Sequence, residues 1–160
     1  MINIEADSGD LELATKDKVH INNRIGKFGH NQQRMTEFIS LLDRHPTAIE
    51  RSANTDMYNC HGLVFAARRT NISDTREVEK ILKHDDYMVI EKESVVPGDI
   101  IVYYSDDKDA EHSGIVIEKG MKPLYIPIII SKWGILEEYI HQANDCEYKF
   151  ANAKYYRMRI

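Results

Sequence analysis

The sequence predicts an α+β domain in which N-terminal helices pack on a mostly antiparallel sheet. Apolar residues recur at spacings of three and four up to about residue 84, and short β-rich runs separated by turn residues follow. Helices that precede the strands, instead of alternating with them, are typical of this fold class. The chain has 160 residues, the usual size of one domain with its own core.

Three helices are expected in the first half of the chain. The first runs from Gln32 to Asp43 and ends before His45-Pro46. The second begins at Cys60 and carries its apolar stripe to Ala67. The third has a capping-box pattern at Ser73-Asp74 and Glu77 and ends near His84. We expect residues 1–30 to form an irregular arm and residues 31–160 to form a single domain.

Strands are expected in the second half, where turn signals such as Pro97-Gly98 and Lys119-Gly120 separate the apolar runs. The predicted strands are Tyr87–Ile90, Asp99–Tyr104, Ser113–Glu118, Leu124–Ser131 and Lys154–Ile160. A short helix is expected from Ile135 to His141, between the last two strands.

Charge and hydropathy exclude two classes of partner. The 21 basic and 26 acidic residues give a net charge of −5, and the basic residues are scattered, which argues against nucleic-acid binding. The longest apolar run, Leu124–Ile130, contains Pro127 and falls short of the roughly 18 residues that span a bilayer. Met1–Asp10 lacks the pattern of a secretion signal, so we expect a cytoplasmic protein or export by a signal-independent route.

Cys60 is the first candidate for chemistry. A thiol at the N-terminus of a helix lies near unpaired backbone N–H groups and the positive end of the helix dipole, which favour the thiolate. A thiolate is the nucleophile of cysteine catalysis, and the same N–H groups can hold the oxyanion that forms when it attacks a carbonyl. The alternative is a small buried apolar residue at the start of a core stripe.

His112 is the second candidate. The turn Pro97-Gly98-Asp99 leads into one predicted strand, and His112-Ser113-Gly114 opens the next. From the end of that strand an imidazole can face the start of the cysteine helix, accept a proton from Cys60 and later protonate the leaving group. A surface histidine is the alternative.

This order of motifs resembles the NlpC-like branch of the papain-fold cysteine peptidases and amidases, over roughly residues 56–134. The cysteine precedes the histidine, as in the unpermuted members of that superfamily. The segments Asn59-Cys60-His61-Gly62, His112-Ser113 and Ser131-Lys132-Trp133-Gly134 are similar to motifs of one bacterial group within it. The resemblance implies a papain-like fold, Cys60 as nucleophile, His112 as general base and Asp99 as a structural turn residue.

The third catalytic position departs from the family pattern. Related enzymes carry a polar residue on the strand after the histidine strand, and here that strand ends at Ser131 and Lys132 without His, Asn or Gln. We expect Ser131 to accept a hydrogen bond from His112. Strand alternation places Lys132 on the opposite face, either as a contact for a carboxylate or oxyanion or outside the cleft. His141 is a further candidate for the third position.

Four residues are expected to line a substrate cleft: Tyr58, His61, Lys132 and Trp133. For His61 an exposed position on the helix is the alternative, and for Trp133 a contact in the core or in a lid. No cofactor is expected.

A zinc site made from Cys60, His61, His112 and Cys146 is disfavoured, because adjacent Cys and His chelate poorly on a helix and no paired zinc-ligand spacing is present. Two cysteines are too few for a disulfide framework. The acidic neighbours of Cys146 raise its pKa, which indicates a bystander thiol.

These observations predict a cysteine hydrolase that cleaves an amide bond in a peptide or protein, as a peptidase, amidase or deamidase. Two alternatives share the same residues. An acyl or amide transferase would use the same dyad, and a papain-like scaffold with impaired catalysis would act as a binding or immunity module. The irregular third position motivates the second alternative.

Overall fold

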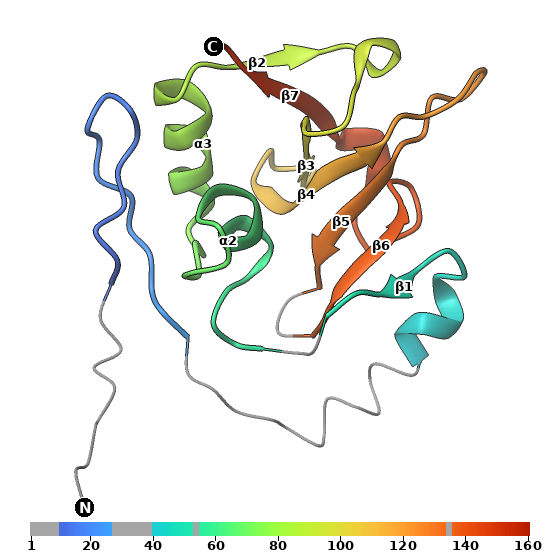
Figure 1. Cartoon of the computed structure of the whole chain (residues 1–160), viewed down its shortest axis with the longest axis horizontal. Coiled ribbons are helices and arrows are strands. Elements are labelled where there is room, and N and C mark those ends of the chain that lie inside the picture. The colour runs from blue at the N-terminus through green and yellow to red at the C-terminus, as the bar shows by residue number, and fades with distance from the viewer. Residues whose placement is uncertain (1–9, 27–39, 53–54, 134–135) are drawn as a thin grey trace, which may run out of the picture.

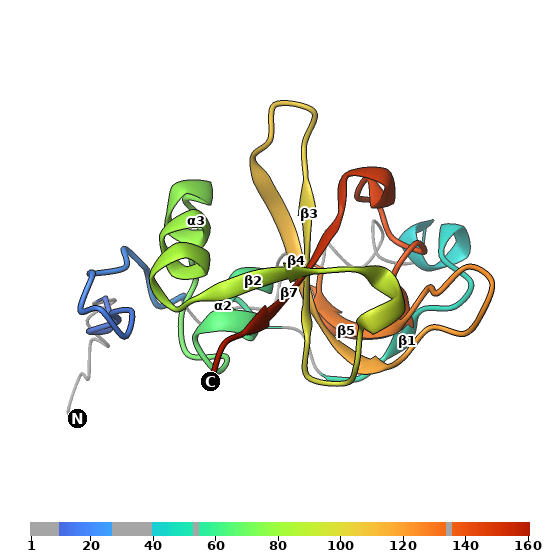
Figure 2. The ribbon, with the colours of Figure 1, turned by 90° about the horizontal axis from the view of Figure 1, so that it is seen from above.

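The computed structural model describes residues 10–26, 40–52, 55–133 and 136–160. Within these residues the chain forms a seven-stranded sheet of order β1-β6-β5-β4-β3-β7-β2, in which every paired neighbour is antiparallel. Helices α2 (Cys60–Phe65) and α3 (Thr75–His84) lie beside each other on one side of the sheet (Figure 1, Figure 2). The predicted α+β class with a mostly antiparallel sheet is confirmed.

The strands and short 3₁₀ helices have the following bounds: β1 Ile49–Glu50, β2 Tyr87–Ile90, η1 Lys92–Ser94, β3 Ile100–Tyr104, β4 Ala110–Glu118, β5 Ile128–Lys132, β6 Glu138–Gln142, η2 Phe150–Asn152 and β7 Lys154–Met158. Residues 40–44 are helical, whereas most of the predicted helix Gln32–Asp43 lies outside the described residues. Helix α2 ends at Phe65, two residues before its predicted end at Ala67.

The helix predicted from Ile135 to His141 is wrong, because residues 138–141 belong to strand β6 and the described residues before them are not helical. Tyr139 pairs with Ser131 and His141 with Ile129, so this segment is hydrogen-bonded along β5. Tyr139 and His141 are both buried on one face of the sheet. Adjacent apolar residues, as in this segment, are compatible with a helix and also with a strand that is buried on both faces. The hydrogen bonds to β5 select the strand.

Three strands begin at different residues from those predicted, β3 only one residue later, at Ile100. Strand β4 starts at Ala110, so His112 lies inside the strand instead of at its head. Strand β5 starts at Ile128, because Tyr125, near the predicted start of the strand, has a positive φ of 53°. This backbone conformation is incompatible with regular strand pairing.

The sheet has a core on each face. On the helical side, Val78 and Ile81 of α3 pack with Val102 of β3. On the other side, Ile101 packs with Ile129 and with residues of the chain between β6 and β7. Val102 and Ile101 point to opposite faces because side chains alternate along a strand.

The N-terminal segment 10–26 contains isolated bridges but no regular helix or strand. Nevertheless Ile21 is only 1% exposed and belongs to the core on the helical side. The backbone N–H of Asn22 donates to the buried carboxylate of Glu77 in α3 over 2.9 Å. This segment therefore packs as part of the domain. Among the described residues, no helix has both the length and the apolar character needed to cross a membrane.

Candidate functional site

The site is built at the start of α2, where Asn59 caps the helix. Its Oδ1 accepts hydrogen bonds from the backbone N–H of Gly62 at 2.9 Å and of Ile72 at 3.1 Å, and its Nδ2 donates to the Ile72 carbonyl at 2.8 Å. An asparagine at this position satisfies helix N–H groups that have no partner within the helix. The cap therefore fixes the first turn, and with it Cys60, against the segment that leads to α3.

Gly62 allows α2 to approach that segment closely. A Cβ atom at this position would lie 1.8 Å from the Thr70 carbonyl oxygen, far inside any van der Waals contact. Helix α2 also packs on β4 and β5, which carry the other site residues. The glycine after Cys60-His61 thus sets the depth of the cysteine in the fold.

The Cys60 thiol is buried among cationic groups. Burial raises its pKa, but the positive charges of His61 and His112 outweigh this effect and hold the pKa of Cys60 well below its usual range. Opposite charges nearby favour an ionised group in this way. Helix α2 has only six residues, so its dipole is a minor influence. The two imidazoles are the groups that stabilise the predicted thiolate.

His112 lies on β4 opposite Tyr103 and is fully buried. Neither of its ring nitrogens has a hydrogen-bond partner among the described residues. Its ring stacks on Tyr148, with centroids 4.0 Å apart and planes 6° apart, and it contacts the Tyr103 ring at 5.4 Å. Buried polar atoms without a partner are rare, and their presence requires an explanation.

Ser131 does not make the hydrogen bond to His112 that the sequence predicts. It pairs with Gly114 across the sheet, and its Oγ lies 2.7 Å from His141 Nε2. It also accepts a hydrogen bond from Trp133 Nε1 at 3.0 Å. The hydroxyl is engaged by β6, and the partner of Ser131 on β4 is Gly114, two positions along the strand from His112.

His141 forms part of the same buried group as Ser131. Its Nδ1 donates to the Gln142 carbonyl at 2.7 Å, so its Nε2 accepts the Ser131 proton. Burial lowers the pKa of His141 to about 4, which keeps the ring neutral at physiological pH. His141 therefore supports Ser131, and no hydrogen bond joins it to His112 among the described residues.

Lys132 is on the opposite face of β5 from Ser131 and is fully buried. Its Nζ donates to the Leu136 carbonyl at 2.6 Å and lies 5.2 Å from the centre of the Tyr58 ring. Burial lowers the pKa of Lys132 to about 8, against the opposing charges of Asp56, Glu137, Cys60 and Glu138. The Cys60 charge is thus one of the influences that favour the protonated amine.

Tyr58 joins a buried carboxylate network at the same end of the sheet. Its hydroxyl donates to Glu138 Oε1 at 2.6 Å. Arg68 and Arg51 also bind this carboxylate, at 2.5 Å and 2.6 Å. Burial, reinforced by Glu138, raises the pKa of Tyr58 to about 12, so the phenol stays protonated.

His61 is buried, so the exposed position considered for it is wrong. Its Nε2 lies 3.1 Å from the Ala110 carbonyl and its Nδ1 lies 2.8 Å from Ser113 Oγ. Burial lowers its pKa, but the charge of Cys60 and the hydrogen bond to Ala110 raise the pKa of His61 above its usual value. The Cys60 charge thus favours the protonated form of His61.

Trp133, expected as a cleft or core residue, is 6% exposed and packs in the interior. Its ring contacts Tyr139, His141 and His45, at centroid distances of 4.3, 5.3 and 5.4 Å.

Two further residues of the site, Tyr148 and Glu138, were not singled out in the sequence. Glu138 lies in the segment for which a helix was predicted, so its place on a strand beside the site could not be expected. Tyr148 lies in a segment without hydrophobic periodicity, so no pattern in the sequence pointed to it.

Cys146 has the properties of a bystander. It is a free thiol of intermediate burial, and burial raises its pKa, with the charges of Asp145 and Glu147 acting in the same direction. Among the residues that the structure describes, no group of three or more His, Cys, Asp or Glu side chains is arranged to hold a metal ion. The two cysteines thus have opposite pKa shifts.

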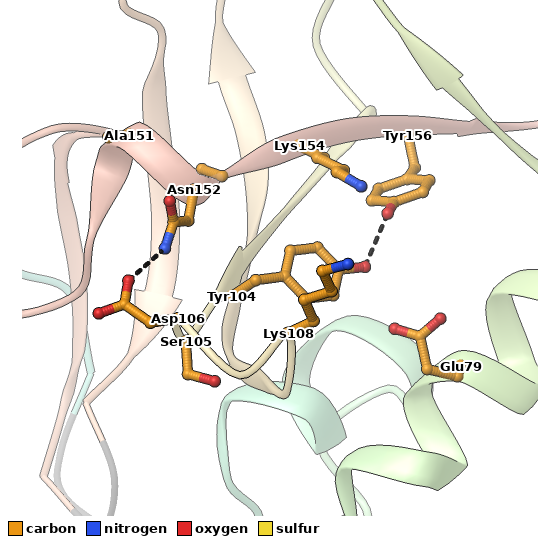
Figure 3. A pocket seen from close by; sticks show the side chains of 10 residues that line it. Glu79, Tyr104, Ser105, Asp106, Lys108, Ala151, Asn152, Lys154 and Tyr156 are labelled. Atoms are coloured by element: carbon orange, nitrogen blue, oxygen red, sulfur yellow. Dashed lines mark hydrogen bonds between the residues drawn. The ribbon is translucent and has the colours of Figure 1, made fainter.

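An open cavity of about 620 Å³ lies at another part of the sheet (Figure 3). Tyr104 and Tyr156 line it, with their hydroxyl oxygens 2.6 Å apart, and Glu79 reaches toward it from α3. Lys108 and Lys154 line it too. None of its lining residues belongs to the group around Cys60, so the cavity and the thiol are separate features.

Comparison with known proteins adds no assignment. Neither the models of protein families, nor the curated proteins, nor the solved structures gave a match to this chain. The functional conclusion therefore depends on the chemistry of the residues around Cys60.

Proposed function

We propose that this protein is a cysteine hydrolase that cleaves an amide bond in a peptide or protein, on a papain-like fold of the NlpC type. Cys60 is the nucleophile and His112 the general base. The observation that carries the proposal is a buried thiol with a strongly lowered pKa, next to an imidazole whose two nitrogens have no other partner in the described part of the chain. Perturbed groups of this kind concentrate at catalytic sites.

The reaction follows from these two groups. The Cys60 thiolate attacks the amide carbon, a C–S bond forms, and the carbonyl electron pair moves to oxygen. Backbone N–H groups in the first turn of α2 stabilise the oxyanion. When the intermediate collapses, the C–N bond breaks and the His112 imidazolium gives its proton to the leaving amine. Water, deprotonated by His112, then attacks the thioester and releases the acid and the thiolate.

The arrangement of elements supports the family resemblance. The cysteine begins a helix that packs on the histidine strand β4, and β3 and β5 flank that strand as antiparallel neighbours. Asp99 has the structural role that the resemblance implies. It is 3% exposed, accepts a 2.7 Å hydrogen bond from the backbone of Val96, and binds Arg157 through two 2.7 Å contacts. These contacts tie the turn before β3 to strand β7.

Transfer to an amine would proceed through the same thioester, with an amine in place of water. The ratio of acid to amide product measured in the presence of added amines separates hydrolase from transferase. Identical residues serve both reactions, so this ratio is the discriminating quantity.

The direct test compares two cysteine variants. Wild-type protein and the Cys60→Ser and Cys146→Ser variants are incubated with a mixed peptide library and with muropeptides, and products are identified by mass spectrometry. Cleavage by the wild type and by Cys146→Ser, but not by Cys60→Ser, supports the proposal. Iodoacetamide at pH 6.5 should alkylate Cys60 before Cys146, because the two pKa shifts are opposite. Equal cleavage by Cys60→Ser would exclude this mechanism.

A binding module is the second candidate, and the burial of the dyad favours it. Cys60 is 7% exposed and His112 is fully buried, while the open 620 Å³ cavity lies elsewhere. A module of this kind would retain a tight complex with a peptide partner in the Cys60→Ser variant and show no turnover in the wild type. Turnover by the wild type would exclude it.

A further inference from the structure

The orientation of His112 needs a physical cause. In a cysteine dyad the far ring nitrogen of the base is ordinarily hydrogen-bonded to a third group, which fixes the tautomer and the ring plane. Here neither nitrogen has such a partner among the described residues, and the predicted donor–acceptor partner Ser131 is bound to His141. Something other than a hydrogen bond must hold the ring.

The strongest contact of the His112 ring is with Tyr148. The two planes differ by only 6° and the centroids are 4.0 Å apart, which is a face-to-face stack. Tyr103 closes on the same imidazole at 5.4 Å with a tilt of 46°, and it also contacts Tyr148 at 6.1 Å. Rotation of the imidazole about its Cβ–Cγ bond would drive its edge into the Tyr148 face. Stacking therefore restricts the ring plane in the way that a hydrogen bond would.

Tyr103 is itself fixed in place. It is fully buried, and its hydroxyl donates to the Ala143 carbonyl at 2.5 Å, at the end of β6. Tyr148 follows in the chain that returns from β6 toward β7, so both rings are anchored to the same region. Burial raises the pKa of Tyr148, and the negative charge of Cys60 acts in the same direction.

We propose that Tyr148 is the positioning residue of the base: its ring face holds the His112 imidazole plane so that a nitrogen edge is directed at Cys60, in place of a polar third residue. This inference rests on the proposed Cys60–His112 chemistry. It assigns the task to the aromatic face and not to the phenol hydroxyl. It also explains why the strand after the histidine strand carries no His, Asn or Gln at its end.

The charged groups around the thiol lie on three elements, none of which carries Tyr148, and the test leaves them unchanged. They are His61 on α2, Lys132 on β5 and His112 itself on β4. The test therefore changes only Tyr148 and measures the thiolate directly.

The experiment measures the rate of Cys60 alkylation by iodoacetamide from pH 5 to 9 in Tyr148→Phe and Tyr148→Leu, each in a Cys146→Ser background. Tyr148→Phe keeps the ring face and should follow the wild-type profile within about twofold. Tyr148→Leu releases His112, so the apparent thiolate pKa should rise by about one unit and the rate at pH 6.5 should fall about tenfold. With an identified substrate, kcat should fall with little change in KM.

Tyr155→Leu is the matched control, since Tyr155 is a buried tyrosine of the same core cluster and no ring contact joins it to His112 in the described structure. It should lose stability without shifting the alkylation profile. An unshifted profile in Tyr148→Leu, or an equal shift in Tyr148→Phe, overturns the proposal. If Tyr148→Leu fails to fold, Tyr148→Met replaces it under the same criteria.

Alkylation requires no substrate, so the two proposals can fail separately. A shifted profile together with an absence of amide cleavage by the wild type supports the positioning role and removes the hydrolase. Amide cleavage by the wild type together with an unchanged Tyr148→Leu profile removes the positioning role alone.

Discussion

The imidazole of His61 is held between two groups of strand β4: its Nδ1 lies 2.8 Å from Ser113 Oγ, and its Nε2 donates to the Ala110 carbonyl. A serine hydroxyl can donate to Nδ1 of the neutral ring or accept from Nδ1–H of the cation. This pair therefore accommodates both protonation states of a buried histidine that lies next to the nucleophile in the sequence. His61 can carry a positive charge beside Cys60 without serving as its base.

His61→Gln should slow the reaction of Cys60 at acidic pH. Without the second imidazolium the pKa of Cys60 rises, because one of the two charges that lower it is removed. The alkylation rate at pH 6.5 should fall about tenfold for each unit of pKa, whereas the rate at pH 9.5 should approach that of the wild type. Ser113→Ala is the control, since it keeps the imidazole and should give a smaller shift. An unchanged rate at pH 6.5 would mean that His112 alone stabilises the thiolate.

Glu138 should make the protein sensitive to acid. Burial raises its pKa, but Arg68, Tyr58 and Arg51 lower the pKa of Glu138 below that of the free side chain. A carboxylate with a lowered pKa contributes stability that is complete above the pKa of the unfolded side chain, 4.5, and is lost as the pH falls below that value through the lower folded pKa. Urea unfolding of Glu138→Gln should show a free energy of unfolding about 2 kcal/mol lower at pH 7, with a flatter dependence on pH below 4.5.

The control for Glu138 is Asp106→Asn. Asp106 forms an exposed ion pair with Lys149 and should leave the free energy of unfolding unchanged within error. If Glu138→Gln lost no more stability at pH 7 than Asp106→Asn, the buried network would not contribute to folding.

Local patterns in the sequence predict the two residues of the proposed dyad, Cys60 and His112, but not the groups that surround them. The helix that starts at Cys60 and the strand that carries His112 both have short-range signals, a stripe of apolar residues and a turn followed by alternation. The Ser131 hydroxyl turns to His141 because of the β5–β6 register, which depends on a segment whose adjacent apolar pairs also fit a helix. Tyr148 reaches His112 from a non-periodic return between two strands, a contact that no local pattern encodes.

Because of Lys132, the free energy of unfolding should rise with pH in the mildly alkaline range. Burial lowers its pKa to about 8, so between pH 8 and about 10 the unfolded chain binds a proton that the folded protein has lost. The free energy of unfolding should therefore increase from pH 8 to 9.5, below the range in which tyrosines ionise. Lys132→Met should reduce the increase to the part that the Cys60 thiolate contributes, whereas Lys119→Met, at an exposed position, should preserve all of it. Urea unfolding at pH 7.5, 8.5 and 9.5 measures the effect, and an equal slope in all three proteins would contradict it.

Gly62→Ala should damage the site through the backbone. Its new methyl group would lie 1.8 Å from the Thr70 carbonyl oxygen, so α2 must move away from the segment before α3. Backbone shifts of this kind cost about 3 kcal/mol, and thermal unfolding should show a corresponding loss of stability.

Gly98→Ala is the matched control, because a Cβ there meets no atom within 4 Å and the cost comes only from a positive φ of 95°. We expect about 1 kcal/mol for Gly98→Ala with an unchanged Cys60 alkylation profile. Gly62→Ala should also shift that profile toward higher pH, since moving α2 separates the thiol from His112; equal profiles in both variants would show that the position of α2 does not control the thiolate.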